Sequence, residues 1–455
     1  MSSPRRRRGR LLSQGTRPCR LTLPRRPTPA APGRRSMSGN EPRSRTLLLY
    51  AVFVAVLAGL AGPGVAAPVN PTARLRIVET RTLWQSPEGG GAQRARFSPD
   101  GRWLAWYVSG GQVGLAALDN PDVITATNAP NGSSITDLVW SRQSQLGVCI
   151  RTETDAGVVR QVAILHPPAP RLVLVGDTAG AYNVAWRQDG RAIAFSTKTA
   201  LFHRDLEGEV TVKLLDEQAG WRPRGAPAYE DLVFVGDRVA ARAAGTMHWW
   251  LIQPGTPPVA LGELRGLCPD PERDRLFAVS WQAGPVHIPR GAGIVSFDLA
   301  ANPPEPSIIV PFDHSDGKIY WLPDIWDATY PTTLRLSPDG RTLSFCGVKV
   351  GELSPNTWRE FCIWQVPSDG SQEPVPVEQT GNIFKRFDVG ETHFIGWRYR
   401  IDSAIVLGDL TRHRAWRLPD EFDVQRANTD VLTDRLLVGA ARGNDVVLIQ
   451  LEEAN

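Results

Sequence analysis

Histidine and methionine are scarce in this chain of 455 residues, and several motifs of catalysis are missing. The seven histidines stand singly, without the spacing of zinc ligands. No Gly-x-Ser-x-Gly nucleophile elbow and no glycine-rich phosphate-binding motif occur. We therefore predict no metal, no cofactor and no catalytic residues. The balance is against an enzyme, although a site assembled from several loops would leave no linear motif.

Apolar runs long enough to span a bilayer as a helix, roughly 20 residues, are also absent. The longest, residues 47–62, follows Arg43 and Arg45 and precedes small residues that end at Ala67. A basic region, a short apolar segment and small residues at the end are typical of a secretory signal peptide. We predict a signal peptide at 46–67 and a place outside the cytoplasm: periplasmic, at the cell surface or secreted. An uncleaved membrane anchor is the alternative.

Large apolar side chains are rare in residues 1–45, which are rich in arginine and proline and are predicted to be disordered. Met37 would start a leader of ordinary length, so residues 1–36 are interpreted as an over-extended gene start. Residues 1–67 hold 13 arginines and one acid, which leaves 38 basic and 46 acidic residues and a formal charge of −8 in the remainder. That acidic body argues against a nucleic-acid partner.

Cysteine is scarce too: four cysteines follow the leader. If residues 342–348 and 360–366 form a hairpin, Cys346 and Cys362 are expected directly opposite each other. A disulfide between them and a pair of small buried thiols are both compatible with the sequence.

What the chain does contain is an internal repeat, clearest in residues 97–106, 186–195 and 336–345. In each, a large apolar residue precedes an Asp-Gly-Arg turn, and a strand follows. Aspartate can accept a hydrogen bond from the backbone two residues on, and glycine adopts positive φ at no steric cost. The predicted structural turn residues are Asp100, Gly101, Asp189, Gly190, Asp339 and Gly340.

Degenerate copies of the repeat, such as those at Asp237, Asp274 and Asp434, bring the total to eight candidate units between residues 72 and 455. A spacing of roughly 40–50 residues is typical of four-stranded propeller blades. No segment shows sustained helical periodicity. We predict an all-β propeller over residues 68–455, with seven or eight blades favoured over six, closed by an outer strand from residues 72–84.

The Ser-Pro-Asp-Gly-Arg turns resemble the WD-repeat-like units of the TolB-like β-propeller family. The resemblance implies a propeller and says little about function. TolB proteins carry an α/β domain before a six-bladed propeller, and neither feature fits this chain. We therefore do not transfer their role in the cell envelope.

An insertion of roughly 20 residues is predicted near 301–333, where the spacing between Asp274 and Asp339 widens. Aromatic residues alternate there with carboxylates, a mixture that can stack on a sugar ring or a peptide side chain and accept its hydrogen bonds. Packing of the tryptophans in the core is the alternative. The candidate ligand-binding residues are His314, Tyr320, Trp321, Asp324, Trp326, Asp327 and Tyr330.

Two functions are consistent with these features. The first is a non-catalytic, monomeric scaffold whose partner is an envelope protein or a glycan. The second is an enzyme of the lyase or lactonase type with its site in the propeller channel. Clustered histidines and carboxylates with perturbed pKa values at one channel mouth would favour the enzyme. The membrane is a partner only if the leader stays uncleaved.

Overall fold

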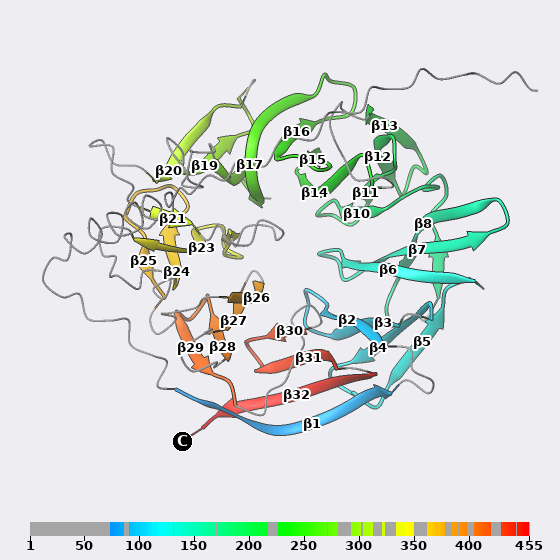
Figure 1. Ribbon diagram of the computed structural model, residues 1–455, viewed down its shortest axis with the longest axis horizontal. Coiled ribbons are helices and arrows are strands. Elements are labelled where there is room, and N and C mark those ends of the chain that lie inside the picture. Colours follow the sequence, from blue (N-terminus) through cyan, green and yellow to red (C-terminus); the bar gives the residue numbers. More distant parts are fainter. Residues whose placement is uncertain are drawn as a thin grey trace, which may run out of the picture. The chain divides into compact units, whose positions relative to one another are not determined.

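The computed structural model divides the chain into two compact units, residues 1–53 and 54–455. It describes parts of the second unit only: residues 73–85, 91–108, 110–130, 132–169, 171–216, 226–270, 272–280, 293–301, 304–312, 321–323, 334–349, 362–377, 385–389, 392–397, 405–419, 429–442 and 444–454. All regular structure in these residues is β-strand, as predicted (Figure 1).

Three four-stranded antiparallel sheets follow one another along the first half of the described chain. The first contains β2 (Ala92–Phe97), β3 (Trp103–Val108), β4 (Gln112–Ala117) and β5 (Ile124–Asn128). The second contains β6 (Ser133–Trp140), β7 (Leu146–Thr154), β8 (Gly157–Leu165) and β9 (Leu172–Leu174). The third contains β10 (Asn183–Trp186), β11 (Ala192–Ser196), β12 (Ala200–Asp205) and β13 (Thr211–Asp216).

The next sheet has seven strands, in the order β14 to β20. They are β14 (Tyr229–Val235), β15 (Arg238–Ala243), β16 (His248–Ile252), β17 (Val259–Asp270), β18 (Arg275–Ser280), β19 (Gly293–Asp298) and β20 (Pro306–Pro311). The 12-residue strand β17 pairs through its first half with β16 and through its second half with β18. One long strand therefore joins two four-stranded units.

Two further sheets cover residues 321–417 of the described chain. The first contains β21 (Trp321–Pro323), β22 (Arg335–Leu336), β23 (Thr342–Lys349), β24 (Cys362–Pro367) and β25 (Val375–Pro376), with both β21 and β22 paired to β23. The second contains β26 (Lys385–Val389), β27 (His393–Trp397), β28 (Ile405–Asp409) and β29 (Arg414–Arg417).

The last sheet joins the two ends of the described chain. Its order is β30 (Thr429–Leu432), β31 (Leu437–Arg442), β32 (Asp445–Glu453) and β1 (Leu75–Gln85), so the first strand is its outer strand. The register runs from Leu75 opposite Glu453 to Gln85 opposite Asp445. This confirms the prediction that residues 72–84 supply the closing strand.

Apolar side chains hold successive sheets together. Each of the eight hydrophobic clusters in the described residues lies between two neighbouring four-stranded units, and one of them packs the two halves of the seven-stranded sheet on each other. The order of these contacts is circular, because the sheet with β1 packs on the sheet with β2. The fold is a β-propeller. The blade number stays a prediction: the described strands form seven sheets, one of which has the length of two units.

The three strong repeat turns share one geometry. Gly101, Gly190 and Gly340 have φ of 63°, 71° and 70°, values that glycine adopts without strain. In each turn the preceding aspartate accepts a hydrogen bond from the N–H two residues on, over 2.9 to 3.1 Å. These are the hydrogen bonds expected from the sequence.

The cysteine pairing expected from the sequence is corrected by the register of β23 and β24. Cys346 stands opposite Ile363, and Cys362 stands opposite Gly347. Partners in an antiparallel pair point to the same face, and neighbours along a strand point to opposite faces. Cys346 and Cys362 are therefore offset by one position in the register instead of directly opposite each other, and the disulfide between them stays a prediction. The side chain of Cys362 is outside the described ones.

Candidate functional site

The candidate site is a cavity of about 380 Å³, here called the channel-side cavity. Its walls come from β14, β16, β17, β22 and the turn after β22, with Arg142 added from the turn between β6 and β7. The first strands of successive units contact each other: β10 contacts β14, β14 contacts β17, and β17 contacts β22. These strands form the inner wall of the propeller, so the cavity opens on the channel side.

The lining of the cavity combines apolar side chains with charges of both signs. Leu232, Val233, Trp249, Leu267 and Leu336 are the large apolar members. The indole of Trp249 is buried, and its Nε1–H donates to the Leu264 carbonyl at 3.0 Å. Arg142, Asp231, Glu272 and Arg335 add charge. Such a cavity can take an apolar group flanked by polar or charged ones.

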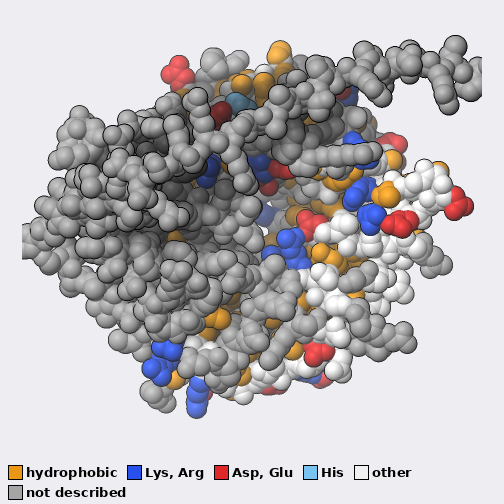
Figure 2. Space-filling view, in the orientation of Figure 1, with side chains coloured by type: hydrophobic (Ala, Val, Ile, Leu, Met, Phe, Trp, Pro, Cys, Tyr) orange, Lys and Arg blue, Asp and Glu red, His pale blue; other side chains and the backbone are white. Residues whose placement is uncertain are grey.

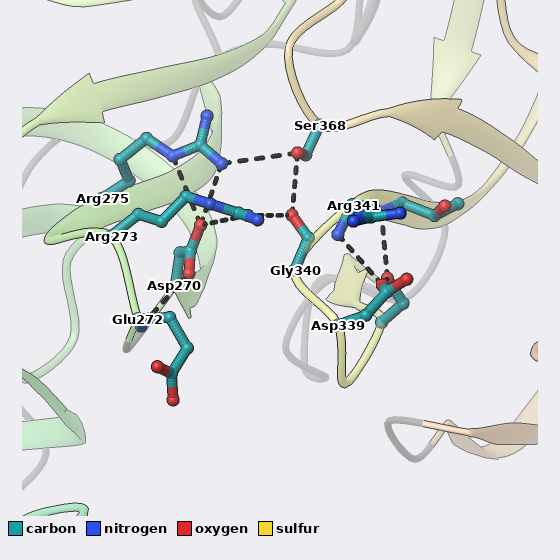
Figure 3. Close-up of polar contacts among 10 residues, drawn as sticks. Asp270, Glu272, Arg273, Arg275, Asp339, Gly340, Arg341 and Ser368 are labelled. Carbon is teal, nitrogen blue, oxygen red and sulfur yellow. Dashed lines mark hydrogen bonds and ion pairs between the residues drawn. The ribbon is translucent and has the colours of Figure 1, made fainter.

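Asp270, at the carboxyl end of β17, anchors one wall of the channel-side cavity (Figure 3). Its side chain is 1% exposed, and its Oδ2 accepts hydrogen bonds from Arg275 Nη2 at 2.9 Å and Arg273 Nη1 at 3.4 Å. Oδ1 accepts from the Glu272 N–H at 3.3 Å. Both oxygens are thus occupied within the protein, and we assign Asp270 a structural role.

The same arginines join two sheets. Arg273 Nη1 also donates to the Gly340 carbonyl at 2.6 Å, and Arg275 Nη2 lies 3.4 Å from Ser368 Oγ. Ser368 Oγ–H in turn donates to the Gly340 carbonyl at 2.9 Å. Figure 3 shows both guanidinium groups pointing from the β17–β18 turn toward the turn at Gly340. This contact fixes the position of the Ser337–Gly340 side of the cavity against β17.

Neighbouring repeat turns are linked in the same way around the third and fourth sheets. Arg187 Nη1 lies 3.2 Å from Asp237 Oδ1, and Gln188 Nε2 donates to Glu272 Oε1 at 3.2 Å. Burial raises the pKa of Asp189, but hydrogen bonds from Arg187 and the Arg191 N–H outweigh it and hold the pKa below its usual value. These polar contacts give the turn side of the propeller a fixed arrangement.

None of the described residues that line the channel-side cavity is a histidine. His203 packs edge-on against Phe234 with 6.0 Å between ring centroids, and burial lowers its pKa. His393 is buried, with Nε2 3.9 Å from Asp430 Oδ1. Within the described ranges, no group of three histidine, cysteine or acidic side chains is placed to hold a metal ion.

The ligand-binding residues predicted from the sequence fall almost wholly outside the described residues. Trp321 begins β21, where its backbone pairs with Lys349, but its side chain is not described. The residues that lie outside are His314, Tyr320, Asp324, Trp326, Asp327 and Tyr330. Their role as a binding site therefore stays a prediction.

The channel-side cavity was not predicted from the sequence, although one of its elements carried a signal. The degenerate turn with Asp274 and Arg275 was recognised as a repeat unit, and it lies directly beside Asp270. Ser368 and Trp249 belong to no motif, and only the packing of the sheets brings them near this turn.

No helix long and apolar enough to cross a membrane occurs in the part of the chain that the structure describes.

Comparison with known proteins gives a limited result. No family model matches the chain, and no curated protein matches it. Among solved structures, the chain is similar to the C-terminal WD40 domain of Sif2, with 10% sequence identity and a TM-score of 0.47. The similarity covers 82% of this chain and 99% of that domain. At this level the likeness adds no argument about function, and the propeller assignment rests on the sheets and their packing.

Proposed function

We propose that this chain is an exported β-propeller, built from TolB-like repeats, that binds a partner at the channel-side cavity and catalyses no reaction. The observation that carries the proposal is the construction of the cavity. Three separate sheets contribute to it, and the Asp270 network fixes one wall before any partner arrives. Such preorganisation reduces the ordering cost of binding.

The chemistry of the lining defines the partner. Apolar residues such as Trp249 and Leu267 lie beside the charged side chains of Arg142 and Glu272. A protein segment that presents one or two apolar side chains flanked by charged residues suits this combination. Cavities of roughly 300–1,000 Å³ are the usual size for compact ligands, so the site takes a short segment and not a broad surface.

Export is supported by the leader pattern at residues 46–67. The test is to express the full chain with a C-terminal tag, fractionate the cells and sequence the amino terminus of the tagged protein. Export predicts an extracytoplasmic protein that begins near Pro68. A cytoplasmic protein that retains residues before Ala67 would contradict it.

Binding is tested by affinity capture of an envelope fraction with the tagged protein, comparing two charge-reversal variants. Arg142→Glu alters the cavity, whereas Arg102→Glu alters an exposed arginine of another repeat turn, outside the cavity lining. We expect a discrete protein that is lost with Arg142→Glu and kept with Arg102→Glu. Equal capture by the two variants would contradict binding at this cavity.

A channel-site enzyme of the lyase or lactonase type is the second candidate. The observation in its favour is the presence of Asp231 and Glu272 together with Arg142 and Arg335 in one channel-side cavity. The test is incubation with an extract of small metabolites and mass-spectrometric detection of any compound consumed. Consumption by the wild type that is lost in Glu272→Gln, with an unchanged melting temperature, would favour the enzyme over the scaffold.

A further inference from the structure

A half-buried histidine lies at the seam between the sheet β10–β13 and strand β14. His203 is on β12, and its ring packs edge-on against Phe234 of β14, with 6.0 Å between the ring centroids. Phe234 is 6% exposed and belongs to the hydrophobic cluster that joins these two units. On β14 it directly follows Leu232 and Val233, which line the channel-side cavity. His203 therefore packs against a strand that forms one wall of that cavity.

The turn between β10 and β11 crosses the same seam with two polar contacts. Arg187 Nη1 lies 3.2 Å from Oδ1 of Asp237, in the turn after β14. Gln188 Nε2 donates to Glu272 Oε1 at 3.2 Å, and Glu272 lines the channel-side cavity. Both carboxylate oxygens of Asp189 lie 2.9 Å from nitrogens of Arg187, which fixes the guanidinium. The turn thus holds a lining residue directly and also holds the turn that ends β14.

Three charged groups of the described chain face His203. Arg187 lies on the turn between β10 and β11, Asp205 ends β12 itself, and Asp237 follows β14. The two residues opposite His203 in the register, on β11 and β13, are apolar. Burial lowers the pKa of His203 and the charge of Arg187 lowers it further, whereas the two carboxylates raise it. The balance keeps the ring neutral at neutral pH.

Mixed charge is common on this protein, since acidic and basic side chains lie interspersed over the described part of the face drawn in Figure 2. The seam adds a titratable ring to such a network. A protonated His203 would repel Arg187 and attract Asp237, which is the carboxylate that Arg187 contacts across the seam. The charged ring would also require more hydration, which opposes its packing against Phe234. Both effects weaken the hold of the β10–β13 sheet on β14.

We propose that His203 is a pH-sensitive switch that loosens the β14 and Glu272 side of the channel-side cavity when the surroundings become mildly acidic. A histidine whose folded-state pKa lies below its unfolded-state pKa, about 6.5, stabilises the fold fully above the unfolded value. That contribution is lost as the pH falls through the folded-state pKa. The switch rests on the proposed partner binding, because a loosened wall is expected to hold the partner less tightly.

The first test is hydrogen–deuterium exchange of the full-length protein alone at about pH 7.5 and about pH 5.5, above and below the usual titration of histidine. Mass spectrometry reads the exchange, which is corrected for its intrinsic dependence on pH. We expect peptides that cover β14 and the end of β17 to exchange at least about threefold faster at the lower pH, because their local opening is favoured. Equal corrected exchange at the two pH values overturns the proposal.

Variants assign the pH response to one side chain. His203→Phe keeps a ring against Phe234 and His203→Gln keeps a polar side chain, and both remove the titratable group. We expect neither variant to show the pH difference. His166→Gln is the control, because His166 is an exposed histidine that follows β8 in the preceding sheet, and it is expected to keep the difference. A difference that persists in both His203 variants overturns the proposal.

The second test repeats the affinity capture of the envelope fraction at the same two pH values. We expect the wild type to retain about fivefold less of the captured protein at the lower pH, and His203→Phe to retain equal amounts at both. Equal retention by the wild type would mean that the seam does not regulate the cavity, which overturns the proposal. Capture of no protein at either pH contradicts the proposed function instead, and the exchange experiment then decides the role of His203 by itself.

Discussion

Arg275 donates to the buried carboxylate of Asp270 across 2.9 Å, and the two residues tie the end of β17 to the start of β18. The side chain of Asp270 is 1% exposed and that of Arg275 is 22% exposed. A carboxylate at that depth depends on its donors, because removing one partner of a buried pair leaves a charge without compensation.

Arg275→Met is therefore expected to lower the free energy of unfolding by about 3 kcal/mol, measured by denaturant unfolding. Arg273→Met is the control, because the side chain of Arg273 is 43% exposed and its Nη1 is 3.4 Å from Asp270 Oδ2. We expect a smaller loss for Arg273→Met. Equal losses in the two variants would contradict the central position assigned to Arg275.

Closure of the propeller through β1 gives a second prediction. Leu75 and Leu83 are 3% and 5% exposed, whereas Val78 on the same strand is 53% exposed. Leu83→Ala is expected to lower the free energy of unfolding by about 2–5 kcal/mol. Val78→Ala is expected to change it by no more than about 0.5 kcal/mol. Deleting residues 72–84 should abolish the cooperative transition seen by circular dichroism. A deletion variant that melts as the wild type does would exclude closure by this strand.

The features that could be predicted from the sequence are local. In the turn at Asp100, Ser98 Oγ–H donates to the aspartate, and the Arg102 N–H does so as well, all within five residues of chain. Such a turn forms wherever the motif occurs, whatever surrounds it. The closing strand was also predictable, because Leu75 and Leu83 needed a core and a ring of repeats needs an outer strand.

Register and sites could not be predicted in this way. The observed register of β23 and β24 differs by one residue from the expected one, because it pairs Cys346 with Ile363 and Cys362 with Gly347, and the identity of the residues does not set that shift. Arg142 and Pro338 line one cavity although almost 200 positions separate them, and only closure of the ring brings them together.

A further feature that the sequence did not reveal is the role of Gly114 in β4. It stands opposite Trp106 in the register, and a Cβ at Gly114 would lie 2.2 Å from the indole ring. Gly114→Ala is expected to lower the free energy of unfolding by about 1–3 kcal/mol, because a core without free space must shift to admit a methyl group.

Gly110→Ala is the matched control for this prediction, because a Cβ at Gly110 would meet no atom within 4 Å. We expect it to change the stability little. Thermal and denaturant unfolding of both variants measures the difference. If Gly114→Ala proved as stable as Gly110→Ala, the packing of Trp106 over the glycine would be wrong.

The turn at Asp339 gives a prediction about pH. Hydrogen bonds from Ser337 Oγ–H at 2.6 Å and from the Arg341 N–H at 3.1 Å hold the pKa of Asp339 below its usual value. When the folded-state pKa of a carboxyl group lies below its unfolded-state pKa, ionisation of the group stabilises the fold. This stabilisation is complete at a pH above the unfolded-state pKa, which is about 3.9. That stabilisation is lost as the pH falls through the lower, folded-state pKa.

Asp339→Asn keeps an oxygen that can accept both hydrogen bonds but removes the charge. We expect a lower melting temperature than the wild type at pH 7, and a gap that narrows as the pH falls below about 4, where the wild-type carboxylate also becomes neutral. Ser337→Ala removes the main cause of the low pKa, so it should destabilise the wild type more than it destabilises Asp339→Asn. A gap that stays constant down to pH 2 would mean that the charge of Asp339 does not stabilise the turn.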